Sequence, residues 1–462
     1  IVWDNSNATG AWSTPANWDT NTEPTSADDL TFPLGLAGTI TTTSTENALS
    51  LTFADAYTLS GGTLALASGN SIHVASGVIA TINNALTITG GFSKTGDGTL
   101  VLGGSNTNAG GTVISAGKIR AANAGALGAA GIVTTVNSAT TLEVANGITL
   151  DRPITLMHGG TVAGIGTATN NGKITIDAAA TAVTLATDSS TDVFSVGNGA
   201  NDITGGSGST VVSLSGPGAV RLGGASDFDG SWAIPTGRLE LGAAAALGDQ
   251  ATTVTLSGGT LSARLNTANT FTGPAGNLTL TTTATLLSDR TSAGAGVTHT
   301  LGTLSMGANT LTVAPGANST SGTAGITLGN VTLTGNPVFD VGDIGSANGK
   351  LTTGSLLGGA ARIITKSGAG DLAITGGSTD LPAGSTFSAT DGNIEMLFPN
   401  LGASTTTAVS SLQNPLGEAS ISITDGALRL LADGTGNSTA QIYQISNAIT
   451  LGGNITLDPD RR

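Results

Sequence analysis

Three pairs of aspartates are the residues whose types and spacing could support acid–base chemistry. Paired carboxylates on neighbouring strands can serve as general acid and general base in glycoside cleavage, or can hold Ca²⁺ beside a basic residue. The pairs are Asp28 with Asp29, Asp227 with Asp229, and Asp340 with Asp343. None has a His, Arg or Lys close by in sequence, so we interpret all three as solvated carboxylates.

The positions of two pairs favour this interpretation. Asp28 and Asp29 fall in an opening segment that differs in composition from the rest of the chain. Asp227 and Asp229 take the place that Thr107 and Ala109 hold in an earlier copy of the same repeat, so we expect a solvated corner there. Stacked coils can still bring distant residues together, and a catalytic groove therefore stays open as an alternative.

Metal-binding and nucleophile motifs are equally weak. The three histidines, His73, His158 and His299, lie far apart and without metal-ligand spacing, so we expect each on an exposed strand or corner. No nucleophile elbow is found, and the chain has no cysteine. The segments 197–202 and 205–208 distantly resemble a calcium-binding nonapeptide, but Thr210 stands where an aspartate is expected. The sequence therefore predicts no catalytic, metal or cofactor-binding residue.

The composition excludes several classes of partner. The formal net charge of −15 opposes docking on nucleic acid or on anionic membranes. No apolar run approaches the roughly 20 residues of a membrane-spanning helix. Ile1 is not an initiator, so we expect a mature chain or a fragment whose export signal has been removed.

Short alternating runs dominate the chain and predict strands. Apolar and small polar residues alternate in every run, which is the period of a strand with one buried face. Glycine-rich corners separate the strands, and aromatic residues make up only 3% of the chain. A sandwich fills its wide core with aromatics, so a thin β-solenoid with coils of roughly 20 residues fits better. Examples of the runs are 86–89, 98–102, 173–176, 254–256, 277–280, 331–334 and 421–423.

One longer pattern occurs three times. Residues 94–128 align without a gap with residues 214–248, so that KTGDG becomes LSGPG and both copies continue to an A-L-G triplet. A third copy begins with KSGAG at 366–370 and needs an insertion before N-P-L-G at 414–417. Repetition with drift indicates architecture, because a catalytic loop is normally needed once.

This glycine pattern resembles the autotransporter-associated β-strand repeat of large bacterial surface and secreted proteins. The resemblance implies an all-β, right-handed parallel β-helix outside a Gram-negative-type cell. The opening W-D, G-A-W-S, N-W and A-D-D motifs resemble the start of extracellular proteins that carry such repeats. We expect the early tryptophans Trp3, Trp12 and Trp18 to plug the end of the solenoid.

From these observations we predict an N-terminal cap with the first coils at 1–58. The solenoid follows at 59–462, with repeat units near 90–210, 211–360 and 361–462. The expected function is that of an extracellular structural or adhesive stalk, fibre or matrix subunit without catalysis. Head-to-tail or lateral self-association and surface glycans are the expected partners. Two alternatives remain: a polysaccharide-binding or polysaccharide-degrading β-helix, and a passenger segment that assists export or spaces a distant head.

Overall fold

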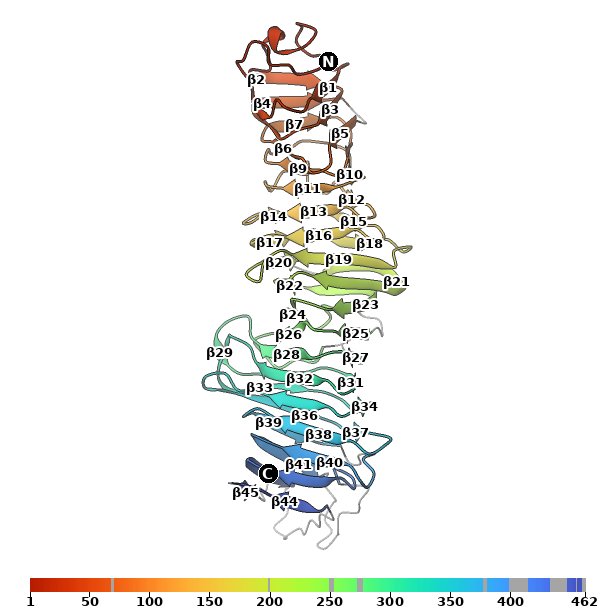
Figure 1. Cartoon of the computed structure of the whole chain (residues 1–462), viewed down its shortest axis with the longest axis vertical. Coiled ribbons are helices and arrows are strands. Elements are labelled where there is room, and N and C mark those ends of the chain that lie inside the picture. The colour runs from red at the N-terminus through yellow and green to blue at the C-terminus, as the bar shows by residue number, and fades with distance from the viewer. Residues whose placement is uncertain are drawn as a thin grey trace. The chain divides into compact units, whose positions relative to one another are not determined.

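The structure is a computed structural model, and it divides the chain into two compact units, Ile1–Gly230 (unit 1) and Ser231–Arg462 (unit 2). Almost all of its secondary structure is parallel β-strand (Figure 1). The one helical element in the described residues is the 3₁₀ turn η1 (Pro15–Asn17). The described residues are 1–67, 70–197, 200–248, 253–271, 277–376, 380–398, 414–432, 447–453 and 455–458.

Unit 1 winds through three columns of parallel strands. The first column contains β1 (Asp29–Phe32), β3 (Ser50–Phe53), β5 (Asn70–Val74), β8 (Phe92–Thr95), β10 (Thr112–Ile114), β12 (Thr134–Val136), β15 (Ile154–Leu156) and β18 (Ile174–Ile176). The second contains β2 (Gly38–Ala48), β4 (Tyr57–Leu66), β6 (Ile79–Ile82), β9 (Thr99–Leu102), β11 (Lys118–Ala121), β13 (Thr141–Val144), β16 (Thr161–Gly164) and β19 (Ala182–Thr187). The third contains β14 (Thr149–Leu150), β17 (Thr167–Asn170), β20 (Val193–Val196) and β22 (Ala219–Leu222). Of the remaining strands, β7 (Ala85–Ile88) pairs with β4, and β21 (Ala200–Ser215) pairs with both of the other columns.

Unit 2 also contains three columns. The first is β25 (Thr253–Leu256), β27 (Asn277–Leu280), β31 (Thr303–Met306), β34 (Val331–Leu333) and β37 (Leu356–Leu357). The second is β24 (Arg238–Leu241), β26 (Thr260–Arg264), β28 (Ala284–Asp289), β32 (Thr310–Pro315), β35 (Val338–Val341), β38 (Ile363–Ser367), β40 (Thr386–Ala389), β42 (Ser420–Ile423) and β44 (Ile449–Leu451). The third is β29 (Gly294–Ala295), β30 (Thr298–Thr300), β33 (Ser319–Thr327), β36 (Ala347–Thr353), β39 (Asp371–Ile374), β41 (Asn393–Phe398), β43 (Gly426–Ala432) and β45 (Ile455–Asp458), and the division between the units falls within β23 (Ala225–Ile234).

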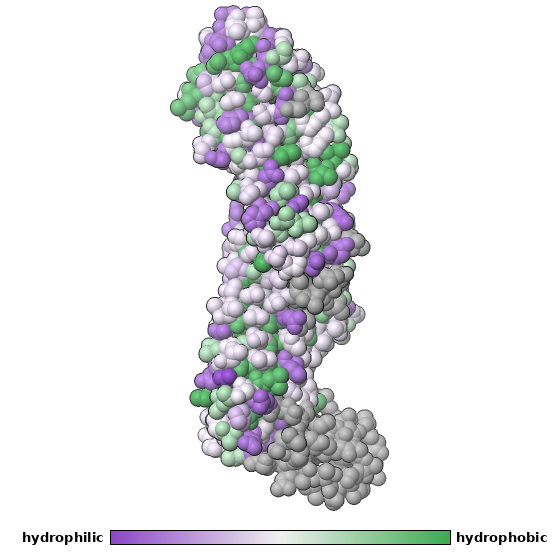
Figure 2. All heavy atoms as spheres, turned by 90° about the vertical axis from the view of Figure 1, so that its right-hand side faces the viewer, coloured by the Kyte–Doolittle hydropathy of each residue, from purple (hydrophilic) through white to green (hydrophobic). Residues whose placement is uncertain are grey.

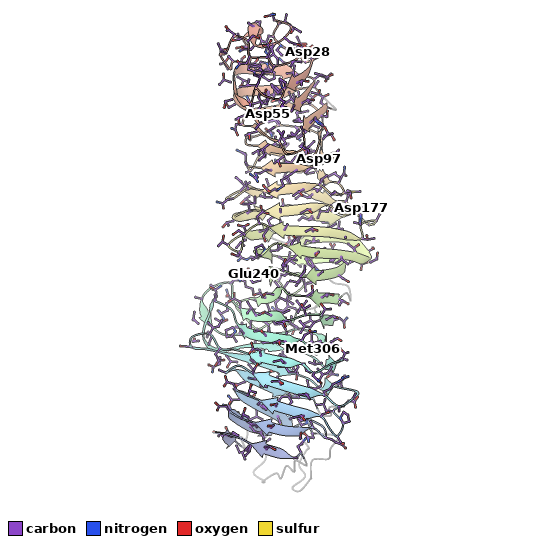
Figure 3. The ribbon with its side chains drawn as sticks, viewed as in Figure 1. Asp28, Asp55, Asp97, Asp177, Glu240 and Met306 are labelled. Atoms are coloured by element: carbon purple, nitrogen blue, oxygen red, sulfur yellow. The ribbon has the colours of Figure 1, made fainter. Side chains whose placement is uncertain are left out.

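The register shows why these short strands are stable. Leu30 pairs with Leu51, and Leu51 pairs with Ile72 one coil further on, so identical positions stack on one another. In unit 2, Met306 of β31 pairs with Leu280 and Leu333, and it is labelled in Figure 3. The interior of each unit is filled mainly by Val, Ile, Leu and Ala, which suits a narrow core. The predicted β-solenoid is confirmed.

The N-terminal segment packs its tryptophans against the first coil of unit 1. Trp18 lies edge-on to both Trp3 and Trp12, with ring centroids 5.0 Å apart in each pair. Phe32 continues this cluster into the core by stacking on Phe53 at 4.8 Å. The backbone of the segment pairs with the first coil, because the Trp3 N–H donates to the carbonyl of Thr31. The segment therefore covers a strand edge that would otherwise be open to further pairing.

Candidate functional site

The three sequence repeats coincide with three sets of six consecutive strands. The first copy is β8–β13, the second is β21–β26 and the third is β38–β43. In each copy the glycine motif forms the corner between the first two strands, and the A-L-G or P-L-G triplet forms a buried turn after the fourth. The repeat detected in the sequence is therefore a structural unit, and its corner is its most specific feature.

Lys94 occupies an interior position at the first of these corners. It pairs with Ile72 on one side and Ile114 on the other, and its side chain is fully buried. Its Nζ donates to the carbonyl oxygens of Thr95 at 2.9 Å, Gly96 at 2.7 Å and Ala116 at 3.1 Å. The last of these belongs to the next coil, so the ammonium ties two successive corners together.

Lys366 repeats this arrangement in unit 2. Its Nζ donates to the carbonyls of Ser367 at 2.8 Å, Gly368 at 2.5 Å and Asp391 at 3.1 Å, and the last lies one coil further on. Burial away from water lowers the pKa of both Lys94 and Lys366 to about 8, and nearby aspartates oppose this effect. Each lysine is a buried group whose three donors are occupied by backbone carbonyls, which is a structural role.

The second copy forms the same corner with Leu214 in place of lysine. Leu214 is 3% exposed and pairs with Leu185. The first glycine of the motif has a positive φ in all three copies, at +72° in Gly96, +87° in Gly216 and +76° in Gly368. A Cβ at these glycines would lie 1.7–2.4 Å from a carbonyl oxygen of the preceding coil. Glycine is therefore required both by the backbone angle and by the close approach of the coils.

An ion pair between the fourth and sixth strands changes its polarity from copy to copy. In the first copy Arg120 of β11 is in register with Glu143 of β13 and forms an ion pair with it. In the third copy Glu395 of β41 is in register with Arg429 of β43, and their side chains are 3.2 Å apart. Glu143 is fully buried, and Lys118 also contacts it at 2.6 Å. In the second copy Glu240 of β24 is in register with Ser262, and its ion pairs are with Arg238 and Arg264. The cross-strand ion pair is therefore shared by the first and third copies, with its polarity reversed.

The predicted aspartate pairs do not form a catalytic constellation. Asp28 is a half-buried loop residue that accepts hydrogen bonds from the backbone and hydroxyl of Thr25, and these bonds lower its pKa. Asp29 accepts from Ser50. Asp227 and Asp229 are exposed, but the corner expected for them is wrong, because they project outward from strand β23. Figure 3 shows Asp28, Asp55, Asp97 and Asp177 at separate points of unit 1, where they do not converge.

Asp340 and Asp343 do acquire a basic neighbour that the sequence did not reveal. Both carboxylates lie close to the glycines of the Lys366 corner, because the preceding coil stacks on it. Asp340 accepts from Ser367 at 3.2 Å and Asp343 from the backbone N–H of Gly349 at 2.7 Å. The Lys366 ammonium points into the coil and its donors are used, so it is not placed to serve as a base.

Two histidines follow the prediction and one does not. His73 and His158 lie outside the core, each within hydrogen-bonding distance of one threonine hydroxyl, Thr95 and Thr181 respectively. His299 lies on β30 in the third column of unit 2, where it pairs with the buried Ile326 of β33 and is itself fully buried. Its Nε2 lies 3.3 Å from the Asp289 carbonyl, and burial lowers its pKa. An exposed position for His299 was therefore wrong.

The possible calcium segment is only partly described, since Asn198 and Gly199 lie outside the described residues. Asp202 is buried, and its carboxylate lies directly against Gly197. Across the described ranges, no group of three or more His, Cys, Asp or Glu side chains could hold a metal ion. A membrane-spanning helix is likewise not found in that part of the chain.

The sequence comparisons agree with the corner geometry. A family described as passenger-associated-transport-repeat matches residues 92–121, which comprise the strands β8–β11 and both corners tied by Lys94. The chain carries an autotransporter passenger repeat. The adhesin BmaC autotransporter of Brucella suis biovar 1 (strain 1330) is 33% identical to it over 201 residues, which are 39% of this chain and 6% of that protein. No solved structure matches the chain.

The buried lysine was the feature that sequence reasoning missed in this passenger repeat. A lysine in an alternating strand is normally assigned to the solvent face. The available signal was the alignment itself, because Leu214 stands where Lys94 stands in the first copy. An apolar residue at the equivalent position marks the site as interior.

Proposed function

We propose that this chain is a non-catalytic, adhesive passenger segment displayed on or released from the surface of a bacterium. The observation that carries the proposal is the passenger repeat at residues 92–121, whose corner is built again in two further copies. The relative named as an adhesin supports an adhesive role, although the chain spans only about 6% of its length. Asp28, Asp343 and His158 each contact a neighbouring backbone or hydroxyl group, which supports a role without catalysis.

The adhesive role is tested with beads that carry the purified chain. Such beads should bind to epithelial cells, to extracellular matrix or to a bacterial lawn above the level of uncoated beads. A chain unfolded by Gly96→Val together with Gly368→Val is the control, since adhesion must depend on the fold. Equal adhesion by the folded and unfolded chains, or no adhesion by either, would contradict the proposal.

Self-association into fibres belongs to the same proposal. Low charge and small outward side chains allow parallel strands of neighbouring molecules to approach each other. Analytical ultracentrifugation and negative-stain imaging of the intact protein test this point. We expect concentration-dependent fibres or lateral bundles, and a monodisperse monomer at high concentration would count against them.

A further inference from the structure

One face of unit 2 carries a regular array of hydroxyl and amide groups. It is formed by β25, β27, β31 and β34, which pair in parallel and without a register shift. Their inward positions are buried aliphatic residues or Met306, and their outward positions are half-buried or exposed. The central outward column, here called the hydroxyl ladder, consists of Thr255, Thr279, Ser305 and Thr332.

The columns on either side of the hydroxyl ladder are already engaged within the protein. Thr303 donates to the Asn277 side chain at 3.3 Å, which links two coils on one flank. On the other flank, Thr281 and Thr334 donate to the carbonyls of Leu256 and Met306 at 3.3 and 3.2 Å. The four hydroxyls of the ladder, in contrast, have no hydrogen-bond partner in the described part of the chain. They are therefore available to solvent or to a ligand.

The face is also uncharged. No Asp, Glu, Lys or Arg occurs in the five-residue windows 253–257, 277–281, 303–307 and 330–334. Figure 2 faces the side on which these strands are labelled in Figure 1 and shows pale residues of intermediate hydropathy interspersed with hydrophilic and hydrophobic ones. Charged partners are recognised through complementary charges, and this face has none although the whole chain carries a net charge of −15. A neutral partner therefore fits the face better than a charged one.

Unit 1 provides a natural contrast. Thr135, Thr155 and Thr175 also form an outward column, on β12, β15 and β18. The residues beside this column include Lys173 and Asp177, so its surroundings are charged. The two columns have the same chemistry at their centres and differ in their flanks.

We propose that the hydroxyl ladder of unit 2 binds an extended, neutral, β-linked polysaccharide chain that lies across successive coils, with one sugar to each coil. The proposal deepens the adhesive function above and rests on it. Parallel strands repeat at about 4.8 Å, close to the length of one sugar in such a chain. Hydroxyl and amide groups exchange hydrogen bonds with sugar hydroxyls. Because the face carries no charge, it offers no ion-pair partner for the uronate or sulfate groups of a charged polysaccharide.

Affinity should accumulate with chain length. The face has no aromatic platform, so each sugar contributes only hydrogen bonds, and each bond is worth about 2- to 10-fold in affinity. A disaccharide should bind poorly and a tetrasaccharide, which reaches all four rungs of the ladder, much more tightly. A regular threonine array could instead bind the surface of ice. An ice lattice requires evenly repeated side chains, and here Asn277, Asn330 and Gly307 interrupt the columns on either side of the hydroxyl ladder.

The test uses isothermal titration of the full chain with neutral β-1,4-glucan and β-1,4-mannan oligosaccharides from the disaccharide to the hexasaccharide. Affinity should rise up to the tetrasaccharide and then level off. The variant Thr255→Val/Thr279→Val/Thr332→Val should lose at least about tenfold, because valine keeps the shape and strand preference of threonine and removes the hydroxyl. The matched control Thr135→Val/Thr155→Val/Thr175→Val should bind as the unchanged protein does, and circular dichroism should show both variants folded.

Four results would overturn the proposal: no binding by the unchanged protein, equal losses in the two variants, preference for sulfated or uronate glycans, or inhibition of ice growth without glycan binding. The outcome is separable from that of the adhesive function. A chain that adheres to cells and ignores neutral glycans keeps the adhesive function and loses the hydroxyl ladder as its site. A chain that binds neutral glycans and does not adhere to cells keeps the hydroxyl ladder as a glycan site and loses the adhesive function.

Discussion

The corner at Lys94 and the corner at Leu214 hold opposite kinds of side chain in the same interior position. At one, an ammonium group is enclosed by three backbone carbonyls; at the other, an aliphatic group pairs with Leu185. The glycines of the two corners agree in backbone angle and in their close approach to the preceding coil. The comparison shows that glycine determines the corner, whereas the interior residue only has to fill it and satisfy its own polar atoms.

The largest expected effect comes from the shared glycine. Gly96→Val and Gly216→Val should each lower the free energy of unfolding by about 3 kcal/mol or more, because a side chain would meet the backbone of the preceding coil at a positive φ. Urea unfolding followed by tryptophan fluorescence measures the loss. Gly77→Val is the matched control, since Gly77 also has a positive φ, +76°, but faces open space. Equal losses at Gly77 and Gly96 would show that the approach of the coils is unimportant.

The interior residue gives the next effect. Lys94→Ala and Leu214→Ala should each lose about 2–5 kcal/mol through the cavity that they leave, and Lys94→Ala also removes the donor to three carbonyls. Lys94→Leu should stay within about 1 kcal/mol of the unchanged protein, because it copies the second corner and avoids a buried charge. Differential scanning calorimetry compares the three variants. A Lys94→Leu loss as large as that of Lys94→Ala would mean that the ammonium is indispensable.

The reversed ion pair supplies a smaller effect. Arg120→Glu alone should lose about 2 kcal/mol, because it places two carboxylates in register across β11 and β13. The triple variant Lys118→Asn/Arg120→Glu/Glu143→Arg should regain most of this loss. It gives the first copy the residues that the third copy has at the equivalent positions, Asn393, Glu395 and Arg429. Chemical denaturation measures both. Failure of the triple variant to recover would show that the copies are not interchangeable at this position.

The dependence of stability on pH is the smallest expected effect. Burial lowers the pKa of Lys94 and Lys366 to about 8, below the value of about 10.5 expected for the unfolded chain. The unfolded state therefore binds more protons between these values, so the free energy of unfolding should rise with pH from about 8 to 10. Lys94→Leu/Lys366→Leu should abolish the rise. Measurements stop at pH 10, because Tyr57, whose pKa burial raises to about 12, acts in the opposite direction above it.

Much of the architecture could be predicted from sequence because short stretches of neighbouring residues determine it. Alternating residues determine which side of a strand is buried, and the glycine pattern determines the corners, so the solenoid and its three copies follow. The clustering of Trp3, Trp12 and Trp18 could be anticipated, because three large aromatic side chains lie close together at the start of a chain whose narrow core is otherwise aliphatic.

What could not be predicted depends on which coil lies next to which. Sequence distance hides the contact of Asp340 and Asp343 with the Lys366 corner. The strands β35 and β38 pair directly, but β36 and β37 lie between them along the chain. The burial of His299 depends on the pairing of β30 with β33, two strands outside the three repeat copies. The hydroxyl ladder likewise appears only when the register of β25, β27, β31 and β34 is known.

Amide hydrogen exchange in Lys94→Leu tests most directly whether glycine, and not the buried lysine, determines the corner. The amides of β8, β9 and residues 95–98 should keep the protection that they have in the unchanged protein, while Lys94→Ala should lose it in the same segment. Loss of protection in Lys94→Leu to the level of Lys94→Ala would contradict the account, because the ammonium and its three carbonyls would then hold the corner together.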